Sequence, residues 1–315
     1  MINFKEEVLK RKDDLIRDLQ TLIRFKSELT TFNPNRADAP FGEGIKDALE
    51  WFLNMANQDG FNTLNVDGYA GHIILGNQET FVGSIGHLDV VPAGNGWEHA
   101  PYGADIVGSL MYGRGTQDDK GPTLAVYYAM KILKELGVEL KHAIKLILGT
   151  DEETAWRGVA YYFEKFPDAP VSGFIPDADF PLIYAEKGIS RINIEAAVEA
   201  SDIIEMTGGF RDNMVPDYAE VKLLPNKAYD DLFNDYLNAH QLKGEARSEK
   251  DTIVLKIHGK SAHGSLPEEG INAIDLLMKF LIDVEQSPFT KRYERYLYKD
   301  LYGKKMDIFH QDEEM

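Results

Sequence analysis

The sequence predicts an α/β domain followed by a smaller α+β domain. Up to about residue 187, stretches with apolar residues at helical spacing alternate with short apolar runs, the pattern of a layered sheet buried on both faces. Beyond residue 188, strand-like segments alternate apolar and polar residues, as antiparallel strands with one face in water do. A length of 315 residues is enough for two domains. We therefore expect domains over 1–187 and 188–315.

The first domain is expected to begin with helices and to continue with alternating strands and helices. Apolar residues recur at helical spacing from Phe4 to Lys26, which predicts an amphipathic helix. Further helices are expected over 45–56, 122–136 and 155–166, and strands over 61–66, 72–76, 81–87, 143–150 and 172–176. Because several of these strands are apolar throughout, we expect a mixed, mostly parallel sheet.

The second domain is expected to be an antiparallel α+β structure. Alternation over 191–200, 217–224 and 252–259 predicts strands, and helical spacing over 226–240 and 271–285 predicts helices between them. The sequence has no internal repeats and no Ser/Gly-rich linker. Short connections between the two domains are therefore expected.

The composition limits the classes of function. With 34 basic and 52 acidic residues the net charge is −18, which disfavours binding to nucleic acid and to anionic lipid. The absence of cysteine excludes disulfides and thiol catalysis, so that any metal must be held by His, Asp and Glu. No apolar run approaches the ~18 residues of a membrane span, and the charged first segment is unlike a signal peptide. We expect a cytoplasmic protein without nucleic-acid or membrane partners.

The first candidate for chemistry is SIGHLDVVP, at the end of an expected strand. Residues two apart share a face of a strand, so His87 and Asp89 project together. A carboxylate beside a metal-bound imidazole fixes its tautomer and orientation. The alternative interpretation is a surface histidine near a turn.

The second candidate is the acidic pair Asp118 and Asp119 in GRGTQDDKGP. Two adjacent carboxylates are stable together when cationic charge lies nearby, and Lys120 offers one compensating charge. The alternatives are a solvated turn and a helix N-cap, where aspartate is favoured.

The third candidate is the group of acids that follows two expected strands. Glu152 and Glu153 come directly after an apolar strand, at the end where open α/β sheets place their sites. Adjacent residues point in different directions, so that one can be a metal ligand and the other a proton shuttle. Asp177 follows the next expected strand. The alternative is that these acids complement the dipole of a following helix.

Taken together, the three candidates predict a metal site made of imidazole and carboxylate ligands. Such ligands suit Zn, Mn or Co, and bridging carboxylates suit two ions about 3.5–4 Å apart.

The motifs HLDVVP, GRGTQDDKGP, GTDEET and PDADFP, in this order, resemble the dinuclear zinc peptidase superfamily of aminoacylases, carboxypeptidases and dipeptidases. The resemblance is greatest to its PepV-like dipeptidase branch and extends over essentially the whole chain. It implies that His87 and Asp177 hold one zinc ion, that Glu153 holds the other, and that Asp118 bridges both. In this family the bridging residue is the first of an adjacent acidic pair, beside a cis peptide bond, which favours Asp118 over Asp119.

The resemblance also implies roles in catalysis. By this resemblance Asp89 would orient His87, and Glu152 would be the general base for a metal-activated water. It further implies that the second domain is a lid, from which His263 would stabilise the oxyanion and Asn213 would contact the substrate. The activity that the resemblance implies for the full-length protein is hydrolysis of unblocked dipeptides, by a monomer.

One departure from the family concerns the end of the sequence. Members of this branch continue well beyond residue 315, with the rest of the lid and a last histidine ligand. We therefore expect a C-terminally incomplete chain that is one ligand short. The alternatives to a dipeptidase are an N-acyl amino acid deacylase and an inactive chain that only binds metal. The remaining histidines lie in no such motif, and we interpret them as structural: His72, His99, His142, His240, His258 and His310.

Overall fold

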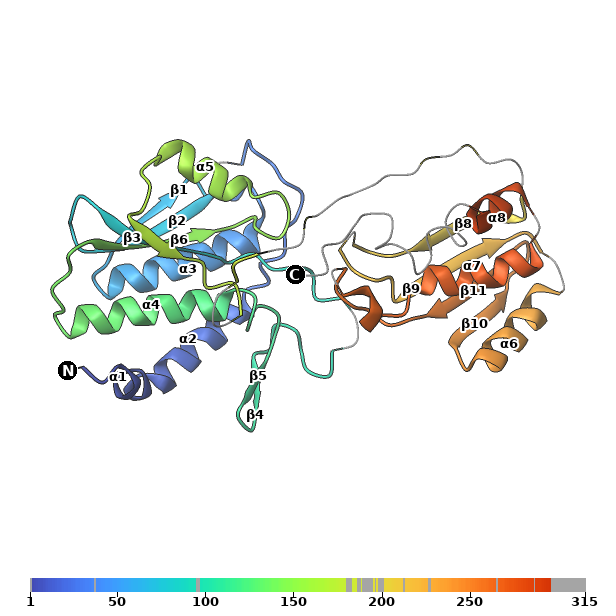
Figure 1. The fold of residues 1–315 in the computed structure, drawn as a ribbon, viewed down its shortest axis with the longest axis horizontal. Coiled ribbons are helices and arrows are strands. Elements are labelled where there is room, and N and C mark those ends of the chain that lie inside the picture. The colour runs from blue at the N-terminus through green and yellow to red at the C-terminus, as the bar shows by residue number, and fades with distance from the viewer. Residues whose placement is uncertain are drawn as a thin grey trace. The chain divides into compact units, whose positions relative to one another are not determined.

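The computed structural model contains two compact units, Met1–Ile183 and Tyr184–Met315, and each is described by itself (Figure 1). The described residues are 2–36, 38–94, 97–179, 183–185, 188, 195, 197, 201–211, 213–225, 228–264, 266–285 and 287–295. His310 and most of the expected strand over 191–200 lie outside these ranges. Within them, no helix has the length and apolar character to cross a membrane.

A five-stranded mixed sheet forms the centre of the first unit, in the order β1-β2-β6-β3-β7. β3 lies between β6 and β7 and runs parallel to both, whereas the β1–β2 and β2–β6 pairs are antiparallel. The strands are β1 (Asn62–Val66), β2 (Ala70–Leu75), β3 (Phe81–His87), β6 (Ala143–Gly149) and β7 (Ser172–Phe174). The predicted α/β class with a mixed sheet is confirmed.

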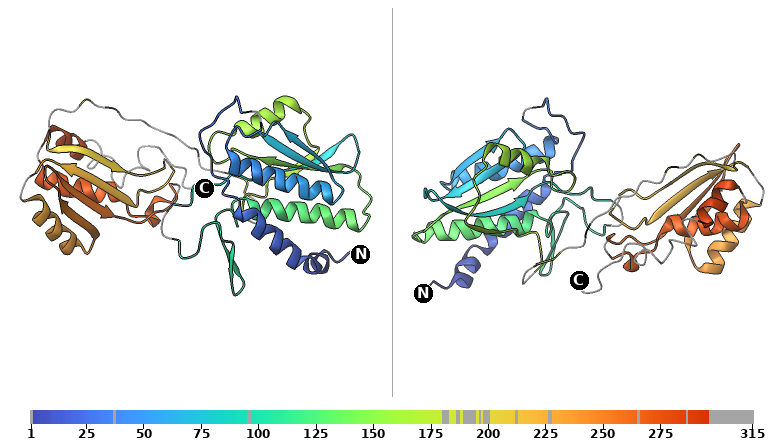
Figure 2. Two further views of the ribbon diagram at one scale, coloured as in Figure 1. Left: turned by 180° about the vertical axis from the view of Figure 1, so that it is seen from behind. Right: turned by 45° about the horizontal axis from the view of Figure 1, so that its top comes forward.

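Helices cover both faces of this sheet. The helices of the first unit are α1 (Phe4–Lys10), α2 (Lys12–Arg24), α3 (Glu43–Gln58), α4 (Lys120–Glu135) and α5 (Arg157–Lys165). Figures 1 and 2 show α3 and α4 on one face and α5 on the other. Along β6, Leu146 and Leu148 join the core that contains α3 and α4, whereas Ile147 packs with Tyr162 of α5. Burial on both faces explains why β6 is almost wholly apolar.

Two local features differ from the sequence expectation. The single helix expected from Phe4 to Lys26 is divided at Arg11, whose guanidinium donates to the Glu7 carbonyl oxygen and to the carboxylate of Glu135 on α4. A hairpin of β4 (Asp105–Val107) and β5 (Leu110–Tyr112) was not expected. It forms a separate two-stranded sheet.

The second unit is an antiparallel sheet in the order β10-β11-β9-β8, with helices packed on one face. Its elements are β8 (Ile203–Gly208), β9 (Tyr218–Leu223), α6 (Tyr229–His240), β10 (Lys243–Ser248), β11 (Ile253–His258), a 3₁₀ turn at Pro267–Glu269, α7 (Ala273–Val284) and α8 (Pro288–Tyr293). Val221 and Leu255 face the helices, whereas Glu220 and Lys256, which face away, form an ion pair. This alternation is the one that the sequence predicted for β9 and β11.

His72 gives the first unit a predictable sensitivity to acid. Its ring is buried on β2, and Nδ1 lies 2.8 Å from the Tyr162 hydroxyl oxygen. Burial, aided by the charge of Lys145, lowers the pKa of His72 to about 4. In the unfolded chain the pKa of a histidine is about 6.5. At a pH between these two pKa values, His72 binds a proton in the unfolded chain but not in the folded chain. The contribution of His72 to the free energy of unfolding therefore falls by about 3 kcal/mol as the pH drops from about 6.5 to about 4.

The variant His72→Gln removes this proton uptake. Between pH 7 and pH 4, the free energy of unfolding of the wild type should therefore fall by about 3 kcal/mol more than that of the variant. The measurement is urea unfolding followed by tryptophan fluorescence, because Trp51, Trp97 and Trp156 all belong to the first unit. A difference that stays constant over this pH range would contradict the prediction.

Candidate metal centre

The candidate site lies at the carboxyl ends of three adjacent parallel strands. His87 is the last residue of β3, and it is paired in register with Gly149, the last residue of β6. Three residues further along the chain from Gly149 is Glu152. On the other side of β3, Ser84 is paired with Phe174, which places Asp177 just beyond the same edge. The backbone register therefore brings together side chains that are distant in the sequence.

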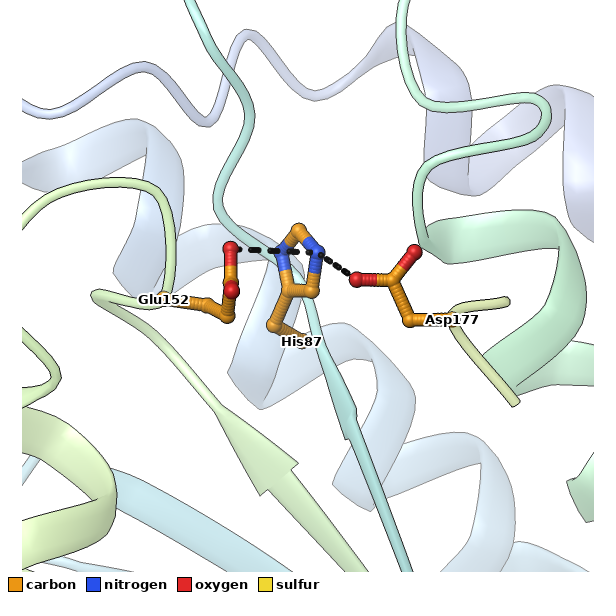
Figure 3. Close-up of side chains that lie close together, drawn as sticks. All are labelled: His87, Glu152 and Asp177. Carbon is orange, nitrogen blue, oxygen red and sulfur yellow. Dashed lines mark ion pairs between the residues drawn. The ribbon is translucent and has the colours of Figure 1, made fainter. Parts of the chain in front are cut away.

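The His87 ring is the centre of a cluster of carboxylates. Its Nε2 lies 3.1 Å from Asp118 Oδ1, 3.4 Å from Asp177 Oδ2 and 3.8 Å from Glu152 Oε2. Figure 3 shows Glu152 and Asp177 approaching the ring from two sides. Potential ligand atoms lie within 4.8 Å of one another in two groups, His87 with Glu152 and Asp177, and His87 with Asp118 and Glu153. All four predicted ligands and the predicted general base thus lie in one cluster.

The two acids of the Asp118–Asp119 pair, which are joined by a cis peptide bond, face different surroundings. Asp118 points to His87, whereas the fully buried Asp119 accepts hydrogen bonds from the His87 backbone N–H and the Thr123 hydroxyl. Gly86 makes this packing possible, because a Cβ there would lie 1.9 Å from Thr123 Oγ1. The ammonium of Lys120 bonds to backbone carbonyls rather than to the acidic pair, contrary to the expected compensation of charge.

Asp89 connects the two sides of the cluster. Its backbone oxygen lies 2.9 Å from His87 Nδ1, and its carboxylate oxygen Oδ1 lies 3.5 Å from the same atom. A carbonyl oxygen only accepts, so Nδ1 carries a proton and Nε2 faces the carboxylates. The Asp89 carboxylate also accepts the backbone N–H groups of Glu152 and Glu153, at 3.2 and 3.1 Å. This second set of contacts was not predicted from the sequence.

The turn after β6 is held by a further ion pair that the sequence analysis missed. Asp151 is buried and receives two hydrogen bonds from the guanidinium of Arg157, at 2.7 and 2.8 Å. The same guanidinium lies over the ring of Phe32. Because Glu152 and Glu153 lie between these two residues, the ion pair shapes the segment that presents them.

The electrostatics of the cluster suit a bound cation. Burial lowers the pKa of His87, but hydrogen bonds with Asp118, Asp177 and Asp89 outweigh it and raise the pKa well above its ordinary value. Burial raises the pKa of Glu152, and burial together with the charge of Asp118 raises the pKa of Glu153 to about 7. Among the described residues, Glu153 Oε1 is buried without a hydrogen-bond partner. Crowded carboxylates with one imidazole and an unpaired buried oxygen are the donor set that a divalent metal ion stabilises.

The two remaining predicted site residues belong to the second unit, where they are neighbours. Met214 pairs with His263 in an isolated antiparallel bridge, and the Gly264 N–H donates to the Asn213 carbonyl oxygen at 2.6 Å. The chain therefore brings Asn213 and His263 together within the second unit. The functions that the sequence predicts for them are part of the proposal below.

His and carboxylate side chains gathered at the ends of parallel strands of an α/β unit form an arrangement typical of metal-dependent enzymes. The model of "Peptidase family M20/M25/M40" matches residues 84–299, and the chain belongs to this peptidase family. A Bacillus subtilis (strain 168) protein named "Putative dipeptidase YtjP" is 40% identical over 99% of this chain and 70% of its own length. A Staphylococcus epidermidis protein named "Putative dipeptidase" is 39% identical over 98% of this chain and 69% of its own.

A similar chain of known structure is human carnosine dipeptidase 1. The likeness has a TM-score of 0.48 and 16% sequence identity, and it covers 82% of this chain and 71% of the other.

Proposed function

We propose that the chain is a zinc-dependent dipeptidase that hydrolyses unblocked dipeptides with an activated water. The observation that carries this proposal is the meeting of His87 with four carboxylates at the ends of β3, β6 and β7, in a member of this peptidase family. The names of the two bacterial relatives support dipeptides as the substrate class.

The proposed ligands divide between two ions. His87 and Asp177 would hold one ion, Glu153 the other, and Asp118 both. Nε2 is the ring nitrogen of His87 that lies near Asp118, Glu152 and Asp177, whereas Nδ1 lies against Asp89. The imidazole would therefore serve a single ion, and the other ion would have oxygen ligands among the described residues. Zinc suits the mixed nitrogen and oxygen set, and manganese or cobalt could replace it. When bound, such ions lower the pKa of a water molecule and polarise the substrate carbonyl.

Glu152 is the proposed general base. Its carboxylate is part-buried within the cluster, and burial raises its pKa, which makes it a better proton acceptor near neutral pH. It takes a proton from the attacking water as the new C–O bond forms. It then gives this proton to the nitrogen of the leaving amine as the C–N bond breaks. The products are a carboxylic acid and an amine, and at neutral pH the acid passes its remaining proton to the amine, which leaves a carboxylate and an ammonium group.

The second unit supplies the remaining proposed contacts. We propose that the region 188–315 acts as a lid, in which His263 stabilises the oxyanion and Asn213 contacts the substrate. Support for these roles comes from the family membership and from the proximity of the two residues.

The test compares two classes of substrate after removal of metal. The purified chain is treated with a chelator, reloaded with Zn²⁺ or Mn²⁺, and assayed with unblocked dipeptides and with N-acetylated amino acids. We expect hydrolysis of the dipeptides that disappears with the metal and returns on reloading. Activity on the acylated compounds alone would replace the proposal with a deacylase. Metal binding without hydrolysis of either class would replace it with an inactive metal-binding chain.

A further inference from the structure

Lys120 is a lysine with no exposed surface, directly after the acidic pair of the candidate metal centre. Its ammonium donates to the carbonyl oxygens of Leu22 and Phe25, at 3.0 and 2.8 Å. These carbonyls lie at the end of α2, where the last carbonyls of a helix have no partner within the helix. A buried lysine is rare unless it is paired, so these two bonds fix its position.

The same short segment also holds the other side of the cluster. The Ser27 hydroxyl donates to the Leu88 carbonyl oxygen at 2.6 Å, and the Ser27 carbonyl oxygen accepts from the Val90 N–H at 3.0 Å. Leu88 is the residue after His87. The segment 22–27 is therefore hydrogen-bonded both to the end of β3 and to the start of α4.

The turn that leads to Lys120 packs closely against the Lys120 side chain and the start of α4. A Cβ at Gly115 would lie 3.0 Å from Lys120 Cδ, and one at Gly121 would lie 2.1 Å from the Thr116 carbonyl oxygen. The Lys120 side chain therefore lies against the turn that carries Asp118 and Asp119.

We propose that Lys120 is a positioning residue for the metal centre. Through the segment 22–27, it sets the separation between Asp118 and His87 that the metal ions require. This inference rests on the proposed function, because it assumes that the cluster binds metal. Lys120 itself contacts neither the metal nor the substrate.

The test is the variant Lys120→Met, which keeps the length of the side chain and removes its donors. Its fold should persist, because the Phe25 carbonyl also accepts from the Ser27 N–H and the Leu22 carbonyl also accepts from the Phe25 N–H. We expect about 10–100-fold weaker Zn²⁺ binding in calorimetric titration. We also expect a changed visible absorption spectrum of the Co²⁺-loaded protein.

Lys131→Met is the matched control. Lys131 lies on the same helix and donates to Asp59 Oδ2 at 2.6 Å, away from the cluster. Its loss should lower the melting temperature but leave the Zn²⁺ affinity and the Co²⁺ spectrum unchanged. If Lys120→Met binds both metals as Lys131→Met does, the inference is wrong. If the wild type itself binds no metal, the proposed function fails instead.

Ser27→Ala provides a second, independent variant. If Lys120 and Ser27 act through one segment, the loss of Zn²⁺ affinity in the double variant is smaller than the product of the two single losses. Independent, multiplicative losses would show that the segment does not link the two sides. If Lys120→Met fails to fold, Ser27→Ala alone still tests the link. Ser27→Ala should then weaken Zn²⁺ binding, and an unchanged Zn²⁺ affinity in this variant would refute the inference.

Discussion

Replacing Glu152 with glutamine is expected to lower kcat by about 10²–10⁴-fold, the usual contribution of a general base. The amide has the shape of the carboxylate but cannot accept the proton of the attacking water. Zinc affinity should be preserved, because Glu152 is proposed as a shuttle and not as a ligand. The measurements are steady-state hydrolysis of a dipeptide and calorimetric titration with Zn²⁺.

Glu153→Gln is the contrasting variant, because the neighbouring carboxylate is a proposed ligand and its loss should weaken zinc binding. Glu164→Gln, at an exposed position on α5, controls for the loss of one negative charge. Glu152 also lies in one of the two groups that could hold a metal ion. A loss of bound zinc in Glu152→Gln would therefore identify it as a ligand and remove it from the role of base.

The second large effect is expected from Asp89→Ala. This change removes the acceptor of two backbone N–H groups, those of Glu152 and Glu153, and the carboxylate beside His87. Zinc binding should weaken about 10–100-fold, as when other groups that orient metal ligands are lost. The free energy of unfolding should fall by about 2 kcal/mol because part-buried donors lose their acceptor.

Asp59→Ala is the matched control for this variant. The Asp59 carboxylate also accepts two hydrogen bonds, from the Tyr127 hydroxyl and the Lys131 ammonium, but it lies outside the cluster. It should lower stability in urea unfolding without changing zinc affinity. Equal zinc affinities for Asp89→Ala and Asp59→Ala would show that Asp89 contributes only to stability.

The placement of site residues at the ends of strands could be predicted from the sequence, because apolar runs are a strong local signal for strands. The apolar runs before His87 and Glu152 mark buried strands, the short run before Asp177 forms an exposed strand at the edge of the sheet, and the carboxyl ends of these parallel strands meet. The residues alone left Asp118 and Asp119 equivalent, and the family resemblance favoured the first. The structure distinguishes them physically, since Asp118 points to His87 while Asp119 is used to hold the backbone.

Other features depend on contacts that no local pattern reveals. Lysine is usually exposed, and the partners of Lys120 are more than ninety residues away in the sequence. β10 has the sequence KGEARS, in which Ala246 is the one apolar side chain, so its alternation carries almost no apolar signal. The β4–β5 hairpin did carry a signal, because Gly108 and Ser109 separate two short apolar runs, as in a two-residue turn.

The pairing of β3 with β6 and β7 determines where the chain can change in length. Side chains alternate between the faces of a strand, so one residue inserted within β3 would turn His87 to the opposite face. The hairpin between His87 and Asp118 lies outside the five-stranded sheet, so residues added at its tip leave the strand pairing intact. Insertions and deletions between related chains should therefore accumulate at the hairpin and be absent from β3, β6 and β7.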